Sequence, residues 1–121
     1  MEATRLLAAA APLLAPAHWK AELANVVWKA AAFHGIDTER CLDLLHIAES
    51  LPITSVDVAE LWRGAVARAV SARHPAYDTL FIELAVREGV PMASYDAVLR
   101  RRFPSVVRTP TALLRRVARR P

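Results

Sequence analysis

Three acidic residues could act together in this sequence, because each lies beside an apolar stripe or at the end of a predicted strand. They are Glu22, Asp78 and Asp96. Three carboxylates brought together would repel one another, and a divalent cation removes that penalty. Oxygen-only ligation favours Mg²⁺ or Mn²⁺, which can activate water and stabilise charge on a phosphodiester. A chain with 12 acidic residues also allows other groupings, so the residue types alone leave this site open.

Two of the candidate positions also have a structural interpretation. Glu22 could form a surface ion pair with Lys29 or Arg5. Ser94, two residues before Asp96, could orient a carboxylate or a water, or it could simply be a small buried residue. The sequence does not decide between these interpretations.

Several other chemistries have little support. The three glycines, Gly35, Gly64 and Gly89, are isolated, so no phosphate-binding loop is indicated. The four histidines lack the spacing of a zinc site, and we interpret them as surface or hydrogen-bonded residues. Cys41 lies on the apolar face of a predicted helix, which favours a buried, unreactive thiol.

Composition indicates one domain with a covered apolar surface and a basic end. The 121 residues suit a single domain, and a mean hydropathy of +0.22 is high for so small a chain. We therefore expect a partner to cover some apolar surface. The net charge of +4 is uneven, and this bias suits a phosphate backbone or an acidic protein, or else a solvated end. The arginines near the end are Arg100, Arg101, Arg102, Arg108, Arg115, Arg116, Arg119 and Arg120.

The first residues have some features of a secretory signal, because Arg5 precedes an apolar run and small residues follow it. Glu2 offsets Arg5, and Pro12 interrupts the apolar run, so we favour the alternative of a cytoplasmic chain. The single cysteine excludes an internal disulfide and fits a reducing compartment. No apolar run is long enough to span a membrane.

Alternating helices and short strands predict an α/β fold with a mostly parallel sheet. A helical bundle is the alternative, because every predicted strand is short. Helices are expected at 2–11, at 18–33, from Asp37 or Thr38 to before Pro52, at 57–72, at 75–88, at 97–102, and after a cap at Thr109 or Thr111. Strands are expected at 12–16, 53–56, 91–95 and 105–108.

Apolar residues recur at helical spacing and predict the buried faces. We interpret Trp19 and Trp62 as packing residues. The stripe expected on the helix at 18–33 is Trp19, Leu23, Val26, Val27, Ala30 and Phe33. The stripe expected on the helix at 57–72 is Val58, Leu61, Trp62, Ala65 and Ala69.

The clearest local signals lie between His74 and Asp96. Pro75 suits the start of a helix, and a negative charge at Asp78 in its first turn suits the helix dipole. Gly89 ends this helix, because glycine adopts the left-handed conformation without steric cost. A short strand follows and ends at Asp96. Both carboxylates therefore lie at element ends, where the chemistry of α/β folds is usually found.

Five segments together match a known pattern in the right order. They are residues 12–19 (PLLAPAHW), 21–30 (AELANVVWKA), 51–53 (LPI), 76–85 (AYDTLFIELA) and 89–96 (GVPMASYD). On these segments the chain resembles PIN-domain ribonucleases, and specifically VapC-type toxins of toxin–antitoxin pairs. The resemblance covers nearly the whole chain.

The resemblance implies a single PIN-like domain over residues 1–121, a three-layer α/β fold with many helices and a short, mostly parallel sheet. It implies that Glu22, Asp78 and Asp96 bind Mg²⁺ or Mn²⁺, and that Ser94 occupies a family Ser/Thr position in the catalytic site. The implied activity is metal-dependent cleavage of RNA. The implied partners are a small antitoxin that covers the site and a second copy of the chain in a homodimer.

One part of the family pattern is missing. The family opens with a central strand that carries an aspartate, and Glu2 does not take its place. The chain is therefore truncated at its N-terminus relative to the family, with one ligand fewer and unpaired strand edges. Either the start codon is assigned too late, or the gene is a degraded remnant. The second explanation gives the alternative function, an inactive PIN-like module that binds protein or nucleic acid. A small basic helical domain unrelated to the family is the third hypothesis.

Overall fold

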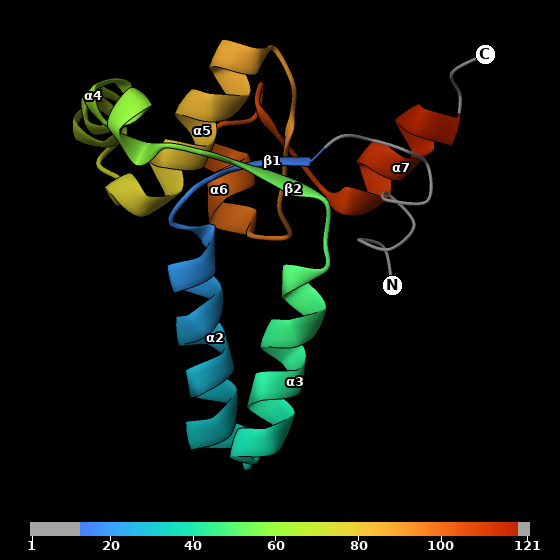
Figure 1. The fold of residues 1–121 in the computed structure, drawn as a ribbon. Helices are drawn as coiled ribbons and strands as arrows, with labels where there is room; N and C mark the ends of the chain where they lie inside the picture. Colours follow the sequence, from blue (N-terminus) through green and yellow to red (C-terminus); the bar gives the residue numbers. More distant parts are fainter. Residues whose placement is uncertain (1–12, 119–121) are drawn as a thin grey trace.

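The computed structural model describes residues 13–118 of the 121-residue chain. The helix predicted at 2–11, Pro12 and the arginines at 119 and 120 lie outside the described residues. The elements in chain order are β1 (Leu13–Pro16), α2 (Trp19–His34), α3 (Thr38–Glu49), β2 (Ile53–Val56), the 3₁₀ helix η1 (Val58–Glu60), α4 (Trp62–Ala72), α5 (Ala76–Glu88), β3 (Met92–Ala93), α6 (Ala97–Arg102), β4 (Val107–Arg108) and α7 (Pro110–Ala118) (Figure 1).

The helix ends follow local chemistry that the sequence predicts. Asp37 rather than Thr38 caps α3, because its carboxylate accepts a hydrogen bond from the Arg40 N–H at 2.8 Å. Thr109 begins α7 in the same way, since its hydroxyl accepts from the Ala112 N–H at 3.1 Å. Gly35 and Gly89 end α2 and α5 with φ angles of 68° and 65°, in the left-handed region that glycine tolerates.

The helix predicted over 57–72 is interrupted near its start. The Asp57 side chain accepts from the Ala59 N–H at 3.0 Å and closes the tight turn of η1. Leu61 lies between η1 and α4 and is 1% exposed. The prediction of one continuous helix was therefore wrong, because the cap chemistry at Asp57 favours a 3₁₀ turn before the α-helix begins.

A tight connection joins α4 to α5. Arg73 ends α4 with a φ of 53°, which is uncommon for a residue other than glycine. The backbone N–H of His74 then donates to the Ala69 carbonyl at 3.1 Å. Pro75 immediately precedes the first turn of α5. The two helices consequently pack against each other, as Figure 1 shows.

The strands form two separate parallel pairs. In the first pair Leu13 of β1 lies opposite Ile53 of β2, and in the second Met92 of β3 lies opposite Val107 of β4. No strand among residues 13–118 joins the two pairs. The α/β class and the parallel pairing are confirmed, and the helical-bundle alternative is wrong. The last two strands are shorter than the predicted ranges 91–95 and 105–108.

Helix α5 holds the two strand pairs in one molecule. Its residues Leu80 and Leu84 contribute to one core cluster, and Ile82 contributes to the other. The hydroxyl of Thr79 is buried and donates to the Ala65 carbonyl of α4 at 2.7 Å. The first cluster is Leu61, Ala65, Leu80 and Leu84, with Val56 and Val58 packed against it. The second is Ile82, Leu99 and Val107, with Met92, Phe103 and Val106 packed against it.

Helices α2 and α3 form a hairpin that extends away from the rest of the molecule (Figure 1). Two residues of the predicted stripe on α2 are consequently exposed, Val26 at 61% and Phe33 at 72%. Trp62, predicted as a packing residue, is also 56% exposed. The predicted stripe on α2 was wrong at Val26 and Phe33, because only one side of α2 is covered by α3, and the predicted stripe at 57–72 was wrong at Trp62. Among residues 13–118, no helix has both the length and the apolar character needed to cross a membrane.

Candidate functional site

Glu22 lies in the first turn of α2 and interacts with a histidine one turn earlier. Its Oε1 is 3.2 Å from Nε2 of His18, and the same nitrogen donates to the Tyr77 carbonyl at 3.0 Å. The His18 ring also meets the Phe81 ring edge-on, with centroids 5.1 Å apart. These contacts bring the start of α2 against the start of α5. Glu22 therefore pairs with His18 rather than with Lys29, one of the two partners of the alternative interpretation, and the other, Arg5, lies outside the described residues.

Asp78 lies in the first turn of α5, where the sequence predicts it. Its Oδ2 is 2.7 Å from Nε2 of His74, four residues earlier. The Asp78 side chain is 36% exposed, whereas the His74 side chain is only 7% exposed. The Asp78 carboxylate is therefore partly exposed, and one of its oxygens is hydrogen-bonded to the buried ring of His74.

Asp96 has a structural role that the sequence analysis did not assign. It is the N-cap of α6, and its Oδ1 accepts from the backbone N–H groups of Val98 at 2.8 Å and Leu99 at 3.2 Å. The hydroxyl of Ser94 accepts from the Asp96 N–H at 3.0 Å. Ser94 is half-buried. It therefore holds the backbone of Asp96 rather than its carboxylate.

The donor chemistry of the three carboxylates suits Mg²⁺ or Mn²⁺, but their arrangement does not complete a site. Among residues 13–118, no three histidine, cysteine, aspartate or glutamate residues lie close enough together to hold a metal ion. Glu22 and Asp78 are linked through His18 and Tyr77, and Asp96 belongs to a separate group at α6. The metal site therefore stays a prediction.

The histidine partners of Glu22 and Asp78 were missed in the sequence. Both acids follow a histidine by four residues, in HWKAE and HPAYD. Residues four apart lie on the same face of a helix, so this spacing could have predicted both histidine–carboxylate pairs. The interpretation of the histidines as hydrogen-bonded residues holds for His18 and His74. One nitrogen, Nδ1 of His18, is buried and has no hydrogen-bond partner in the described part of the chain.

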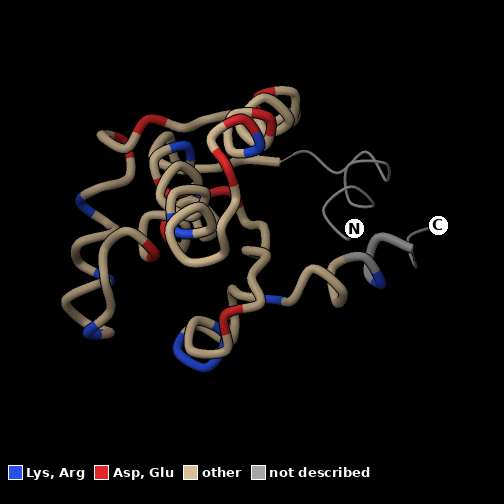
Figure 2. The backbone as a smooth tube through the Cα atoms, turned by 90° about the horizontal axis from the view of Figure 1, so that it is seen from below, with Lys and Arg blue, Asp and Glu red and all other residues tan. Residues whose placement is uncertain are grey.

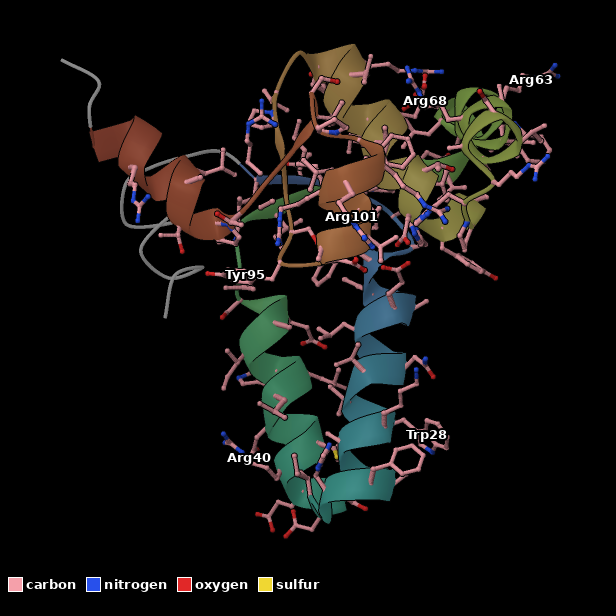
Figure 3. The ribbon with its side chains drawn as sticks, turned by 180° about the vertical axis from the view of Figure 1, so that it is seen from behind. Trp28, Arg40, Arg63, Arg68, Tyr95 and Arg101 are labelled. Carbon is pink, nitrogen blue, oxygen red and sulfur yellow. The ribbon has the colours of Figure 1, made fainter. Side chains whose placement is uncertain are left out.

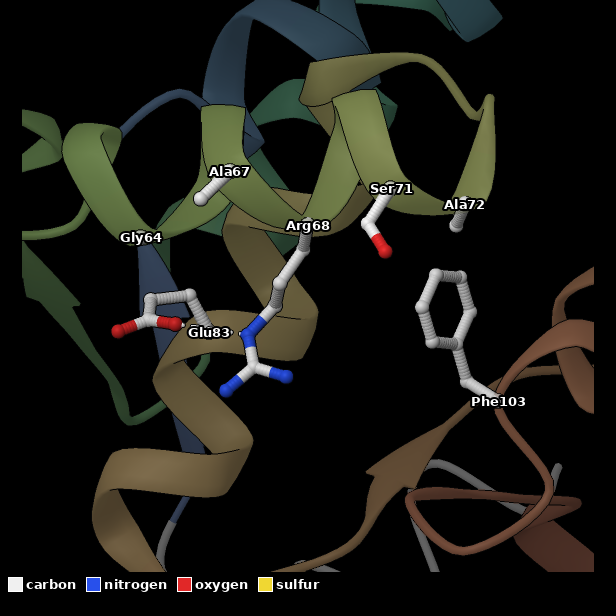
Figure 4. Close-up of a pocket in the computed structure, with 7 residues that line it drawn as sticks. All are labelled: Gly64, Ala67, Arg68, Ser71, Ala72, Glu83 and Phe103. Atoms are coloured by element: carbon white, nitrogen blue, oxygen red, sulfur yellow. Dashed lines mark hydrogen bonds and ion pairs between the residues drawn. The ribbon is translucent and has the colours of Figure 1, made fainter.

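A shallow depression of about 430 Å³ lies between α4, α5 and the end of α6 (Figure 4). Arg68 and Glu83 form its floor at one end, and the Phe103 ring forms the wall at the other. Its lining residues are Gly64, Ala67, Arg68, Ser71, Ala72, Glu83 and Phe103.

Glu83 is the most buried acidic residue in the described part of the chain, and its side chain is 10% exposed. Its carboxylate accepts from Nε of Arg68 at 2.8 Å and from Nε of Arg87 at 2.5 Å. The hydrogen bond from Arg68 lowers the pKa of Glu83 most strongly, burial opposes this, and Arg87 and both positive charges lower it further. A Cβ at Gly64 would lie nearer than 3.0 Å to this carboxyl group, so glycine permits the close approach of α4 to Glu83.

The arginines of α6 form the longest basic stretch of the tube in Figure 2. Arg101 is exposed, and Figure 3 shows its side chain extending from α6. Arg102 instead donates to backbone carbonyls at the end of α4, and Arg100 approaches the Ser94 carbonyl at 3.5 Å. Two arginines of the basic end, which suits a phosphate backbone, an acidic protein or solvent, thus make contacts within the chain.

Comparisons with models of known protein families and with curated proteins found no match for this chain.

Proposed function

We propose that the chain is a metal-dependent endoribonuclease of PIN type, a VapC-like toxin that hydrolyses RNA phosphodiester bonds. The observation that carries the proposal is the placement of three acids in the elements that the resemblance implies. Glu22 and Asp78 lie in the first turns of α2 and α5, which contact each other through His18. Asp96 follows β3 and precedes α6.

The arrangement of the strands supports the same proposal. The resemblance implies that a central aspartate-bearing strand is missing, which would leave strand edges unpaired. Two parallel pairs share α5 as their common packing element, and residues 13–118 contain no strand between them. Two separate pairs agree with the unpaired strand edges that the resemblance implies.

Mg²⁺ or Mn²⁺, when bound, would supply an activated water for attack on the phosphodiester. The proposal requires the Asp96 carboxylate to approach Glu22 and Asp78, whereas it caps α6 in the described arrangement. Asp78 already presents one oxygen at the surface beside the start of α2.

The proposed partners follow from the exposed surfaces. Apolar side chains stand exposed on the α2–α3 hairpin, and Trp28 points away from it in Figure 3. Such a surface suits a protein contact, and we assign it to the antitoxin or to the second copy of a homodimer in the cytoplasm. The exposed apolar residues of the hairpin are Val26, Trp28, Phe33, Leu42 and Ile47.

One observation favours a second candidate function, an inactive PIN-like module that binds protein or nucleic acid. The three acids occupy separate hydrogen-bond groups, and α6 carries three arginines in its last turn. A module of this kind would hold RNA through its basic residues without cutting it.

The two candidates differ in a direct assay. Single-stranded RNA incubated with the protein and Mn²⁺ should be cleaved, and EDTA should stop the cleavage, because the proposed chemistry depends on the ion. Gel electrophoresis of end-labelled RNA measures both results. A mobility shift without cleavage in Mn²⁺ would reject the nuclease and support the binding module, and cleavage that persists in EDTA would reject metal dependence.

A further inference from the structure

A buried imidazole links α6 to the Asp78 carboxylate. Nη1 of Arg102, the last residue of α6, lies 3.1 Å from Nδ1 of His74. Nε2 of the same ring lies 2.7 Å from Oδ2 of Asp78. The two ring nitrogens of His74 therefore face two partners of opposite character, a guanidinium and a carboxylate.

This pair of contacts fixes the tautomer of His74. A guanidinium can only donate hydrogen bonds, so Nδ1 must accept and carries no proton. The proton of the neutral ring is then on Nε2, which donates to the carboxylate. A doubly protonated ring would direct an N–H group at Nδ1 against the N–H group of Arg102. The contact with Asp78 is therefore a hydrogen bond from a neutral imidazole to a carboxylate.

Arg102 is itself held in place. Nη1 carries two hydrogens, and its two nearest acceptors are the Arg73 carbonyl at 2.8 Å and Nδ1 of His74 at 3.1 Å. The left-handed conformation of Arg73 ends α4 beside this guanidinium. Phe103 meets the His74 ring edge-on, with centroids 5.8 Å apart and planes at 90°. Packing and hydrogen bonds thus leave the His74 ring one orientation.

We infer that Arg102 and His74 are positioning residues, which orient Asp78 so that one oxygen is held and the other is offered to a ligand. Oδ2 is occupied by His74, and Oδ1 has no hydrogen-bond partner among residues 13–118. The inference rests on the proposed function, because it takes Asp78 as the functional carboxylate. The ligand that suits a free carboxylate oxygen at this surface is a cation. Outer-sphere hydrogen bonds of this kind fix the orientation of a ligating carboxylate.

Nitrogen-15 NMR of the whole chain without metal tests the hydrogen-bond chain by itself. His74 should show a protonated Nε2 and an unprotonated, hydrogen-bonded Nδ1, the tautomer that its two contacts require. Arg102→Met removes the hydrogen-bond donor to Nδ1, so the Nδ1 resonance should shift to that of an imidazole nitrogen that accepts no hydrogen bond. Arg101→Met removes the same charge from α6 without touching His74, and it should leave the Nδ1 resonance unchanged. A protonated Nδ1 in the wild type, or no response to Arg102→Met, would overturn the inference.

Cleavage of RNA with Mn²⁺ then separates positioning from packing. His74→Phe keeps a ring against Phe103 but removes the N–H, and it should lower the cleavage rate about 10–100-fold. His74→Gln places an amide N–H where Nε2 stood and should retain most of the rate. Equal losses in both variants would reject a positioning role. Unchanged cleavage by Asp78→Asn would instead reject the proposed function, while the NMR result still decides the hydrogen-bond chain.

Discussion

Asp96→Asn should reduce Mn²⁺-dependent RNA cleavage by at least about 100-fold, because the carboxylate that we propose as a ligand of the ion is replaced by a neutral amide. The substitution is well suited to the question. Asparagine caps a helix about as well as aspartate, so the bonds to the N–H groups of Val98 and Leu99 can persist. The loss of cleavage should therefore occur with little change in thermal stability.

The matched control is Asp37→Asn. Asp37 caps α3 through the same type of hydrogen bond, to the Arg40 N–H at 2.8 Å, and has no place in the proposed site. It should leave cleavage at the wild-type rate. If Asp96→Asn also cleaved RNA at that rate while folding normally, its assignment as a ligand would be rejected.

Glu83→Gln should lower the free energy of unfolding by about 1.5–3 kcal/mol, the range for hydrogen bonds that involve a charged group. The carboxylate accepts from both Arg68 and Arg87, and a glutamine in its place would turn an NH₂ group toward one of them. Urea unfolding followed by circular dichroism measures the difference. Glu49→Gln, an exposed acid on α3, is the control and should change stability by less than about 0.5 kcal/mol.

The difference between wild type and Glu83→Gln should depend on pH. The pKa of Glu83 in the folded protein lies below the ordinary value of 4.5, so the carboxylate stabilises the fold above that pH. The stabilisation is lost as the pH falls below 4.5 and through the lowered pKa of the folded state. A difference that grew on acidification would contradict this account of the ion pairs.

Local chemistry predicted most element ends. The cap at Asp37 and the left-handed conformation at Gly89 depend only on residues a few positions away. The sequence alone therefore predicts these helix ends. The partners of Glu22 and Asp78 were equally local, since each histidine lies four residues earlier. The partners predicted for Glu22 were Lys29 or Arg5, and those predicted for Asp78 were the helix dipole and a metal ion, so neither prediction included the nearby histidine.

Burial and distant contacts were harder to predict. Val26 and Phe33 follow a helical stripe, but their exposure depends on the hairpin standing away from the rest of the molecule. The contact of Arg102 with His74 spans 28 residues, and no periodicity connects the two positions. Glu83 was not singled out, although Arg87 follows it by four residues and gave a local indication of an ion pair.

The separation of the strands into two pairs has a simple physical basis. Strands of two to four residues provide few hydrogen bonds, so each pair depends on helix packing for stability. Helix α5 provides this packing to both pairs, with Leu80 and Leu84 on one side and Ile82 on the other. The alternating order of helices and strands predicted parallel pairing in one sheet; the pairing is parallel, but the described strands form two separate pairs.

A Mn²⁺ titration followed by electron paramagnetic resonance, which counts the free ion, tests the central claim most directly. The wild-type chain should bind Mn²⁺, and Glu22→Gln, Asp78→Asn and Asp96→Asn should each weaken binding by at least about tenfold. Asp43→Asn, an exposed acid on α3, should bind as the wild type does. No binding by the wild type, or wild-type affinity in all three variants, would contradict a metal site formed by Glu22, Asp78 and Asp96.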